Sequence, residues 1–378
     1  MLSIQSKPPD VIFSGNPAWF SVEQSPDGPR QIRATLKDGA TEVGSFYSFA
    51  SSQNIAHFEL SELIESVVNS RFSLTPEEEI IERQIFTKIL SHTIKTFSVT
   101  FSDNSHETSC SFTVIKGKIT PDLYSLIGYG YEYESISQYL LNNPVLSIKP
   151  KDIYVHHPDQ PERIYLYLKE EMSISVEVTA HLPGGVISES IATFSATANS
   201  IYYINTSYES IIPELSIKHV SHCSFYRIRL YSGAYPITPW YDHYVNFSTK
   251  SKGCFVFQNS LGGYDTLPTT GNLSLRSTRA HDASQVAQNP FLKQNTSVIS
   301  NIKTSSLYTQ NTGMLPSSYA HFIQQLLYSP KAYWLPFGES PMEITIDQAN
   351  INISKTPGEL VSAQIPFFFN PKLKAEQQ

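Results

Sequence analysis

The chain has 378 residues and a formal net charge of −7, and no Lys/Arg-rich run occurs in it. Binding to phosphate backbones needs a basic surface that releases counterions, so this charge argues against nucleic acid as a partner. Only 16% of the residues are charged and 12% are aromatic. The surface must therefore rely on Ser, Thr, Asn and Tyr, which suits contacts with other proteins or with sugars. The length predicts two or three domains.

We expect neither an export signal nor a membrane span in this chain. Its first residues lack an apolar core of signal-peptide length, so we expect no cleaved signal peptide and a reducing cytoplasm as the place of synthesis. No apolar stretch approaches the ~20 residues that a spanning helix needs, so no membrane insertion is expected. Cys110, Cys223 and Cys254 are far apart and odd in number, which predicts buried thiols rather than a disulfide framework.

Residues 1–118 are predicted to form an immunoglobulin-like sandwich with a short helical insert. Strand-like pieces flank a Lys-Asp-Gly turn at residues 37–39, a common hairpin signal. An amphipathic helix is predicted from Leu60 to Val68, where apolar residues recur at helical spacing. The charged "TPEEEIIER" is predicted to be an excursion or a short helix. Period-2 alternation in "TFSVTFSD" and "CSFTVIKG" then predicts further strands.

A Tyr-rich connector, residues 119–145, is predicted to follow. It contains a possible helix at Ile136–Leu141, and its apolar residues need burial. Residues 146–250 are predicted to form a second immunoglobulin-like sandwich, because short alternating strands such as "RIYLYL" are separated by regular turn signals. The two sandwiches could be a divergent tandem repeat, although no internal identity establishes a duplication.

The last part, residues 251–378, is predicted to be a separately folding α+β module. Tyr319, Phe322, Ile323, Leu326 and Leu327 form a helical stripe. Ser317 is placed as its N-cap, and Pro330 ends the helix. Alternating strands follow it and close the chain. The predicted fold class is therefore mainly β, with two immunoglobulin-like β-sandwiches followed by a C-terminal α+β module.

A glycine pair interrupts the strand-like stretch "FQNSLGGYDTL". A phosphate-binding glycine loop needs a helix N-terminus after it, whereas here Pro268 and Gly271 follow without helical periodicity. We therefore expect a structural turn, in which glycine tolerates a positive φ that costs other residues about 1–2 kcal/mol. Asn259 is expected to bond back to the turn backbone and Tyr264 to re-enter the sheet. The turn comprises Asn259, Gly262, Gly263, Tyr264 and Asp265.

Residues with catalytic or metal-binding potential are sparse, and we expect no enzyme activity, no catalytic residue, no cofactor and no metal site. His219, His222 and Cys223 have a ligand-like spacing without a second ligand pair. Glu132 and Glu134 are interpreted as a solvated strand face. The polar stretch of His156, His157 and Asp159 is interpreted as an exposed turn. A glycan hydrolase would instead need a cleft with two carboxylates.

Two groups of aromatic residues are candidates for contacts with a ligand or a partner. Trp240 and Tyr241 in "YPITPWYDHY" could stack on sugars, or they could form an aromatic corner that packs two domains together. The closing strand carries Phe367, Phe368 and Phe369, which cannot all face one side of a sheet. We therefore expect Phe368 and the apolar stripe of the preceding helix to contact a partner.

The stretch Phe257–Leu267 resembles structural proteins of tailed phages and prophages of Bacteroidetes bacteria. In those proteins an aromatic strand, Asn, Leu-Gly, an aromatic residue and Asp occur in this order. Ile12–Glu23 and the helix "YAHFIQQLLYSP" with the strands after it are similar to the same proteins. The resemblance implies a non-enzymatic structural component of a phage tail or a tail-derived particle. It implies assembly in the host cytoplasm, a place in the virion tail, and contacts with other tail proteins and its own copies.

The alternative function is a carbohydrate- or receptor-binding module at a tail tip or a cell surface. Glycans would then be partners, and Trp240 with Tyr241 would be the first residues to test.

Overall fold

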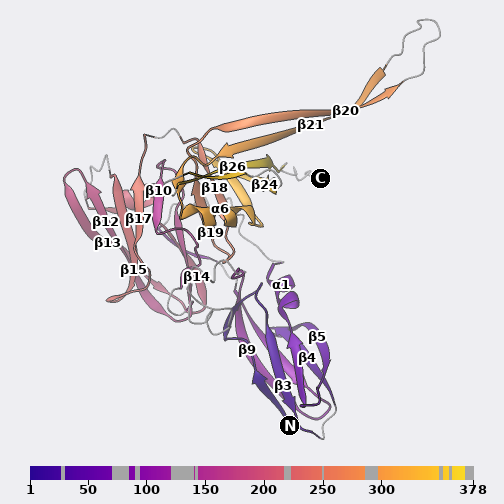
Figure 1. Cartoon of the computed structure of the whole chain (residues 1–378). Coiled ribbons are helices and arrows are strands. Elements are labelled where there is room, and N and C mark those ends of the chain that lie inside the picture. Colours follow the sequence, from indigo (N-terminus) through magenta and orange to yellow (C-terminus); the bar gives the residue numbers. More distant parts are fainter. Residues whose placement is uncertain are drawn as a thin grey trace, which may run out of the picture.

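The computed structural model describes residues 1–26, 30–69, 85–89, 94–120, 140, 144–216, 223–248, 251–285, 297–348, 352–356 and 360–370. Strands dominate these ranges, which confirms the predicted mainly β class. Within them the strands form five sheets. Figure 1 shows the sheets gathered into three parts that meet at a common junction, with a long hairpin projecting from the third part.

Two sheets that enclose one apolar cluster make up the first part. Phe97, Val99 and Phe101 alternate along one strand and are all fully buried, as their period-2 spacing predicts. Ile64 and Val68 of the predicted helix join the same cluster. One sheet has the strand order β1 (Leu2–Ser6), β3 (Trp19–Gln24), β6 (Ile55–Glu59). The other sheet has the strand order β2 (Val11–Phe13), β9 (Glu107–Ile115), β8 (Ile94–Ser102), β4 (Gln31–Asp38), β5 (Thr41–Phe49). The helix is α1 (Ser61–Asn69).

The second part again has two sheets around its own apolar cluster. Ile174, Val176, Val178 and Ala180 face inward from one strand. One sheet has the order β10 (Asp152–Val155), β17 (Tyr241–Val245), β15 (Phe225–Ser232), β12 (Met172–Leu182), β13 (Gly185–Ala196), with β16 (Tyr235–Pro236) beside β15; the other has β11 (Arg163–Leu168), β14 (Ser200–Asn205), β7 (Phe86–Ile89); α5 (Tyr208–Ile211) and the 3-10 helix η1 (Ile212–Glu214) follow β14.

The two parts begin and end in the same way. In the first part β1 pairs with β3, and β2 then pairs in parallel with the last strand, β9. In the second part Val145 bridges to Leu166 of β11, and β10 then pairs in parallel with the last strand, β17. The opening segment of each part therefore contacts one sheet first and crosses to the other.

One strand of the second part comes from the sequence of the first. β7 lies in the chain between β6 and β8, yet it pairs antiparallel with β14, from Ile201 opposite Ile89 to Ile204 opposite Phe86. The backbone N–H of Asn205 also donates to the carbonyl of Ile85 at 2.8 Å. The first part thus supplies an edge strand to its neighbour. The predicted excursion "TPEEEIIER" lies outside the described residues.

The third part is a sheet packed on one helix. Its strand order is β19 (Tyr264–Pro268), β18 (Gly253–Gln258), β23 (Ala332–Pro336), β24 (Met342–Ile346), β26 (Leu360–Phe369), β21 (Ser297–Asn311), β20 (Leu273–Gln285); β22 (Leu315–Pro316) and β25 (Asn352–Thr356) also pair with β26, and the helix is α6 (Tyr319–Leu327). Ser318 rather than Ser317 precedes α6, and it makes no side-chain cap bond. The prediction of Ser317 as N-cap is therefore wrong, although its carbonyl accepts the N–H of Ala320 at 3.0 Å.

The apolar stripe of α6 is covered within the chain. Tyr319, Phe322, Ile323 and Leu326 are buried in a cluster with strands of the same sheet. Phe257 of β18 meets Phe322 edge-to-face with 5.1 Å between the ring centroids. The expectation that this stripe contacts a partner is therefore wrong, because the nine-stranded sheet supplies the cover that the sequence pattern did not reveal.

A further buried cluster joins all three parts. Phe13 and Ile115 of the first part pack there with Tyr165 and Tyr203 of the second and with residues of the third such as Tyr264. The third part has its own apolar cluster but shares this one. The same cluster also buries Leu140, the one described residue of the predicted helix Ile136–Leu141.

Candidate functional site

The glycine turn lies at the junction of the three parts. The side-chain Oδ1 of Asn259 accepts the backbone N–H groups of Leu261 at 2.9 Å and of Gly263 at 3.1 Å. The Asn259 backbone N–H donates to the carbonyl of Gly263 at 2.8 Å, and β19 begins at Tyr264. Gly262 has a φ of +95°, a conformation that L residues rarely adopt. One asparagine side chain thus organises the whole turn.

The same asparagine links the turn to the second part. Its Nδ2 donates to the carbonyl of Leu146 at 3.0 Å and to Oδ2 of Asp265 at 2.7 Å. Asp265 is fully buried and also accepts the Ser147 hydroxyl at 2.5 Å and the Ile148 N–H at 3.2 Å. A buried carboxylate needs such donors, because desolvation without them is costly. The segment that opens the second part is therefore held by the turn.

The turn also contacts the end of the first part at very short range. The backbone N–H of Lys118 donates to the carbonyl of Ser260 at 2.5 Å. A Cβ added at Gly262 would lie 2.3 Å from the carbonyl oxygen of Lys116, and one added at Gly117 would lie 2.8 Å from the Leu261 carbonyl. These glycines let two backbones approach each other more closely than any side chain allows.

A buried ion pair lies in the second part near this junction. Lys149 Nζ donates to Glu162 Oε2 at 2.9 Å, and both side chains are almost fully buried. Gln160 donates to the other carboxylate oxygen at 2.8 Å. Burial raises the pKa of Glu162, while Lys149 acts in the opposite direction. Burial, assisted by the charge of Lys149, lowers the pKa of His243 to about 3.

The candidate ligand aromatics do not form a common surface. The half-buried Trp240 ring lies under two guanidinium groups, with Arg227 at 5.0 Å and Arg229 at 5.6 Å from the ring centroid. Tyr241 is buried at 5% exposure inside the cluster of the second part. This geometry favours packing over sugar stacking, and the packing contacts of Trp240 lie within one sheet. On β26, Phe367 is buried while Phe368 is exposed, as alternation requires.

Replacing Trp240 with alanine is expected to lower the free energy of unfolding by about 1–3 kcal/mol, through lost cation–π contacts and lost burial. Binding to a glycan array should be the same for both proteins. Urea unfolding gives the first quantity. A glycan signal that the wild type gives and the Trp240→Ala protein loses would instead support the stacking hypothesis.

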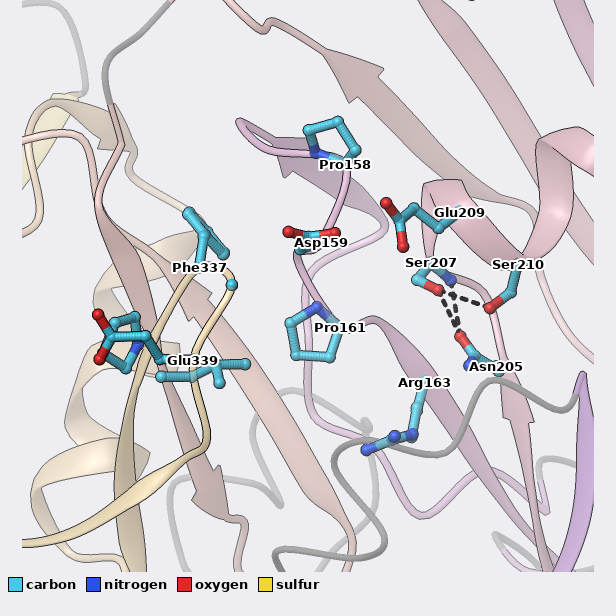
Figure 2. A pocket seen from close by; sticks show the side chains of 13 residues that line it. Pro158, Asp159, Pro161, Arg163, Asn205, Ser207, Glu209, Ser210, Phe337 and Glu339 are labelled. Carbon is cyan, nitrogen blue, oxygen red and sulfur yellow. Dashed lines mark hydrogen bonds between the residues drawn. The ribbon is translucent and has the colours of Figure 1, made fainter.

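A pocket of about 240 Å³ lies between the second and third parts (Figure 2). In that view Glu209 and Ser207 lie on one side of Asp159, and Phe337 lies on the other. The Ser207 hydroxyl donates to Asn205 Oδ1 at 2.7 Å, and its oxygen lies 3.0 Å from the Ser210 hydroxyl. Three carboxylates line the pocket, those of Asp159, Glu209 and Glu339, but all three residues are at least partly exposed. A general acid is normally held in an apolar, buried site, and none of these three carboxylates has such surroundings.

The prediction of an exposed turn at residues 156–159 is wrong. His156 is buried, and its backbone N–H donates to the Gln160 side chain at 3.0 Å. The His157 ring stacks on Phe337 of the third part, with ring centroids 4.2 Å apart. The segment is therefore a contact between two parts of the molecule, which a polar sequence without apolar periodicity could not reveal.

The other candidate residues from the sequence lie outside the described residues or do not come together in a site. His219, His222, Glu132 and Glu134 lie outside the described residues. No cluster of three or more metal-ligating side chains occurs among the residues that the structure describes. Cys223 and Cys254 are buried free thiols as expected, but Cys110 is only half-buried. In the described ranges, none of the helices has the length and hydropathy of a membrane span.

The hairpin β20–β21 is the most extended feature of the third part. It pairs Leu273 with Gln310 at the sheet and Gln285 with Ser297 at its far end, with one register shift between them. Figure 1 shows its outer half well away from the three parts. Among the described strands of this sheet, β20 is an edge strand, so one side of it is not paired. The sequence showed here only a Ser/Thr/Gln/Asn-rich stretch.

Comparison with known proteins leaves the family open. No family model and no curated protein matches this chain. Among solved structures, it is similar to a chimeric titin Z1Z2, with 10% identity over 65% of this chain and 96% of that chain and a TM-score of 0.17. It is also similar to a marsupial T cell receptor, with 7% identity over 98% and 92% of the two chains and a TM-score of 0.18. TM-scores this low do not support any conclusion about function.

Proposed function

We propose that this chain is a non-enzymatic structural component of a phage tail or a tail-derived particle. It is built from two immunoglobulin-like sandwiches and a C-terminal α+β module, and it assembles through contacts with its own copies and with other tail proteins. The observation that carries this proposal is the projecting hairpin β20–β21. The resemblance of Phe257–Leu267 to phage structural proteins supports it, because this stretch holds the three parts together.

The strand order supports the assignment of two immunoglobulin-like sandwiches. In such folds the first strand crosses between sheets and pairs in parallel with the last. β2 with β9 and β10 with β17 both have this arrangement. Each part also places one strand pair, β4–β5 or β12–β13, at the far edge of its larger sheet. The repeat of one topology supports a duplication that sequence identity does not reveal.

The hairpin supports an assembly role because of its energetics. An isolated two-stranded hairpin is marginally stable in water, since each strand pairs on one side only and neither face is covered. Beyond the body, β20 and β21 pair with each other, while β21 pairs with β26 only at Tyr308–Asn311. An unpaired edge is also a template for another strand. A neighbouring subunit that binds this hairpin would pair with its free edge and cover its faces.

The proposal is tested by removing the hairpin without disturbing the sheet. Ser277 lies opposite Ser306 in the register, so residues 278–305 can be replaced by Asn-Gly, a turn suited to two-residue hairpins. We expect this variant to keep the melting temperature of the full chain but to lose incorporation into particles. Immunogold labelling of particles from cells that encode the chain measures incorporation, and light scattering measures self-association.

The matched control shortens a different hairpin. Replacing residues 181–186 with Asn-Gly closes β12–β13 at the pair Ala180–Ile187 and should leave incorporation unchanged. Absence of labelling on any particle with the wild-type chain would contradict the tail assignment. Normal incorporation of the variant without the β20–β21 hairpin would contradict the role of the hairpin.

A further inference from the structure

A second and larger cavity, of about 470 Å³, lies where the first part meets the third. Its size falls within the ~300–1,000 Å³ of small-molecule sites. Its walls come from five segments of the chain. These are Ser14, Glu65 of α1, the segment after β9, the glycine turn, and the C-terminal end of α6 with the residues that follow it. The cavity therefore exists only when the parts are joined.

Three buried polar atoms of this wall have no hydrogen-bond partner among the described residues: Gln258 Oε1, Ser260 Oγ and Thr120 Oγ1. Gln258 is only 2% exposed, and its Nε2 donates weakly to the Gly262 carbonyl at 3.4 Å, which leaves Oε1 as the atom without a donor. Buried polar groups are normally hydrogen-bonded, and an unpaired one is destabilising. Three such atoms beside one cavity leave hydrogen bonds that a bound water or a ligand can make.

The cavity also carries excess positive charge. Lys116 and Lys118 line it, against a single carboxylate, that of Glu65, among the described lining residues. Burial lowers the pKa of the Lys116 ammonium to about 8, the nearby charge of Lys331 acts in the same direction, and the charge of Glu65 opposes both. An anion in the cavity would relieve both effects, because it returns favourable interactions to a charge that burial has destabilised.

We propose that this cavity binds a sugar acid, a small ligand that carries one carboxylate and several hydroxyl groups. The carboxylate is recognised by Lys116 and Lys118. A ligand hydroxyl donates to Gln258 Oε1, which a simple anion without hydrogens cannot do. Ser260 and Thr120 hydroxyls can donate or accept as the ligand requires. Tyr328, which also lines the cavity, is 75% exposed.

The three orphan atoms lie just below the cavity surface, with almost no accessible area of their own. A ligand reaches Gln258 Oε1 after rotation about χ3, a broad torsion, and reaches the Ser260 and Thr120 hydroxyls after a change of χ1 rotamer. The same chemistry is offered by a free sugar acid and by a uronate residue within a polysaccharide. A monomer and an oligomer of one uronic acid distinguish these two sources.

Titration calorimetry of the full-length chain with glucuronate, an oligouronate, glucose and acetate tests the proposal. We expect saturable binding of a uronate in monomeric or oligomeric form, and at least about tenfold weaker binding of glucose and acetate. Lys116→Met should weaken uronate binding about tenfold or more. Ser260→Ala should weaken it about threefold or more without lowering the melting temperature, because the removed hydroxyl has no partner to lose. Lys151→Met, in the second part, is the control.

Three results would overturn the proposal. One is the absence of saturable binding for both uronate forms at millimolar concentration. Another is uronate binding that stays unchanged in both the Lys116→Met and the Ser260→Ala chains. The third is glucose binding as tight as uronate binding. The hairpin variant that lacks residues 278–305 keeps this cavity intact, so assembly and ligand binding are measured independently.

Discussion

Replacing Gly262 with alanine is expected to lower the free energy of unfolding by about 2–5 kcal/mol. The φ of +95° alone costs an L residue about 1–2 kcal/mol. The new Cβ would also lie 2.3 Å from the Lys116 carbonyl oxygen, a backbone atom held in the junction. Such overlap adds about 1–3 kcal/mol or forces the first and third parts apart. Urea unfolding followed by near-ultraviolet circular dichroism measures the loss.

Gly39→Ala is the matched control for this prediction. Gly39 has a φ of +61°, also in the left-handed region, but a Cβ there would meet nothing within 4 Å. This variant should therefore lose only the conformational part, about 1–2 kcal/mol. Equal losses for the two variants would show that the close approach at Gly262 has no energetic weight. The structural role of the turn would then have to be abandoned.

Replacing Lys149 with methionine is expected to lower the free energy of unfolding by about 3–5 kcal/mol at neutral pH. The change leaves the Glu162 carboxylate buried without its cation, and removing one partner of a buried pair typically costs this much. Gln160 still donates to Glu162, but a neutral donor replaces little of the lost interaction. Denaturant unfolding at pH 7 measures the effect.

The pH dependence of the Lys149→Met chain follows from the direction of the Glu162 shift. Burial already raises the pKa of Glu162, and loss of the opposing Lys149 charge must raise it further. A group whose folded pKa is raised contributes its stability below the unfolded pKa and loses it as pH rises through the folded value. The variant should therefore recover part of its deficit as pH falls below 7, because a proton bound by Glu162 removes the unpaired buried charge.

The surface pair Lys7–Asp10 provides the comparison. Its two side chains are 46% and 67% exposed, so Lys7→Met should cost at most about 1 kcal/mol. If the Lys149 variant lost no more than this one, or if its deficit did not shrink on acidification, the buried pair would not act as a charged pair in the folded chain.

Local patterns in the sequence predicted local structure well. The alternation of Phe97, Val99 and Phe101 and the helical spacing around Ile64 and Phe322 depend on neighbours within a few residues, and the structure buries all of these side chains. The glycine stretch could be recognised as a turn for the same reason. The unpaired polar atoms of Gln258 and Ser260 could not be predicted, because their surroundings include distant segments, such as those of Lys118 and Gln325.

Contacts between distant segments were beyond prediction. His156 and His157 looked like an exposed polar turn, since nothing in their own segment shows that Phe337 stacks on His157. The stripe of α6 looked uncovered, because β26, which helps to cover it, follows it in the chain. The Ser317 cap was misplaced by one residue, and helix ends fray over about one or two residues.

The strand β7 has a mechanical consequence. It is covalently flanked by strands of the first part but hydrogen-bonded to β14 of the second. Tension that pulled the two parts away from each other would load this ladder together with the connection through the junction. The first and second parts therefore cannot unfold independently, one after the other, under tension. We expect a single high-force rupture when a molecule is stretched between its ends, where independent sandwiches would give two separate events.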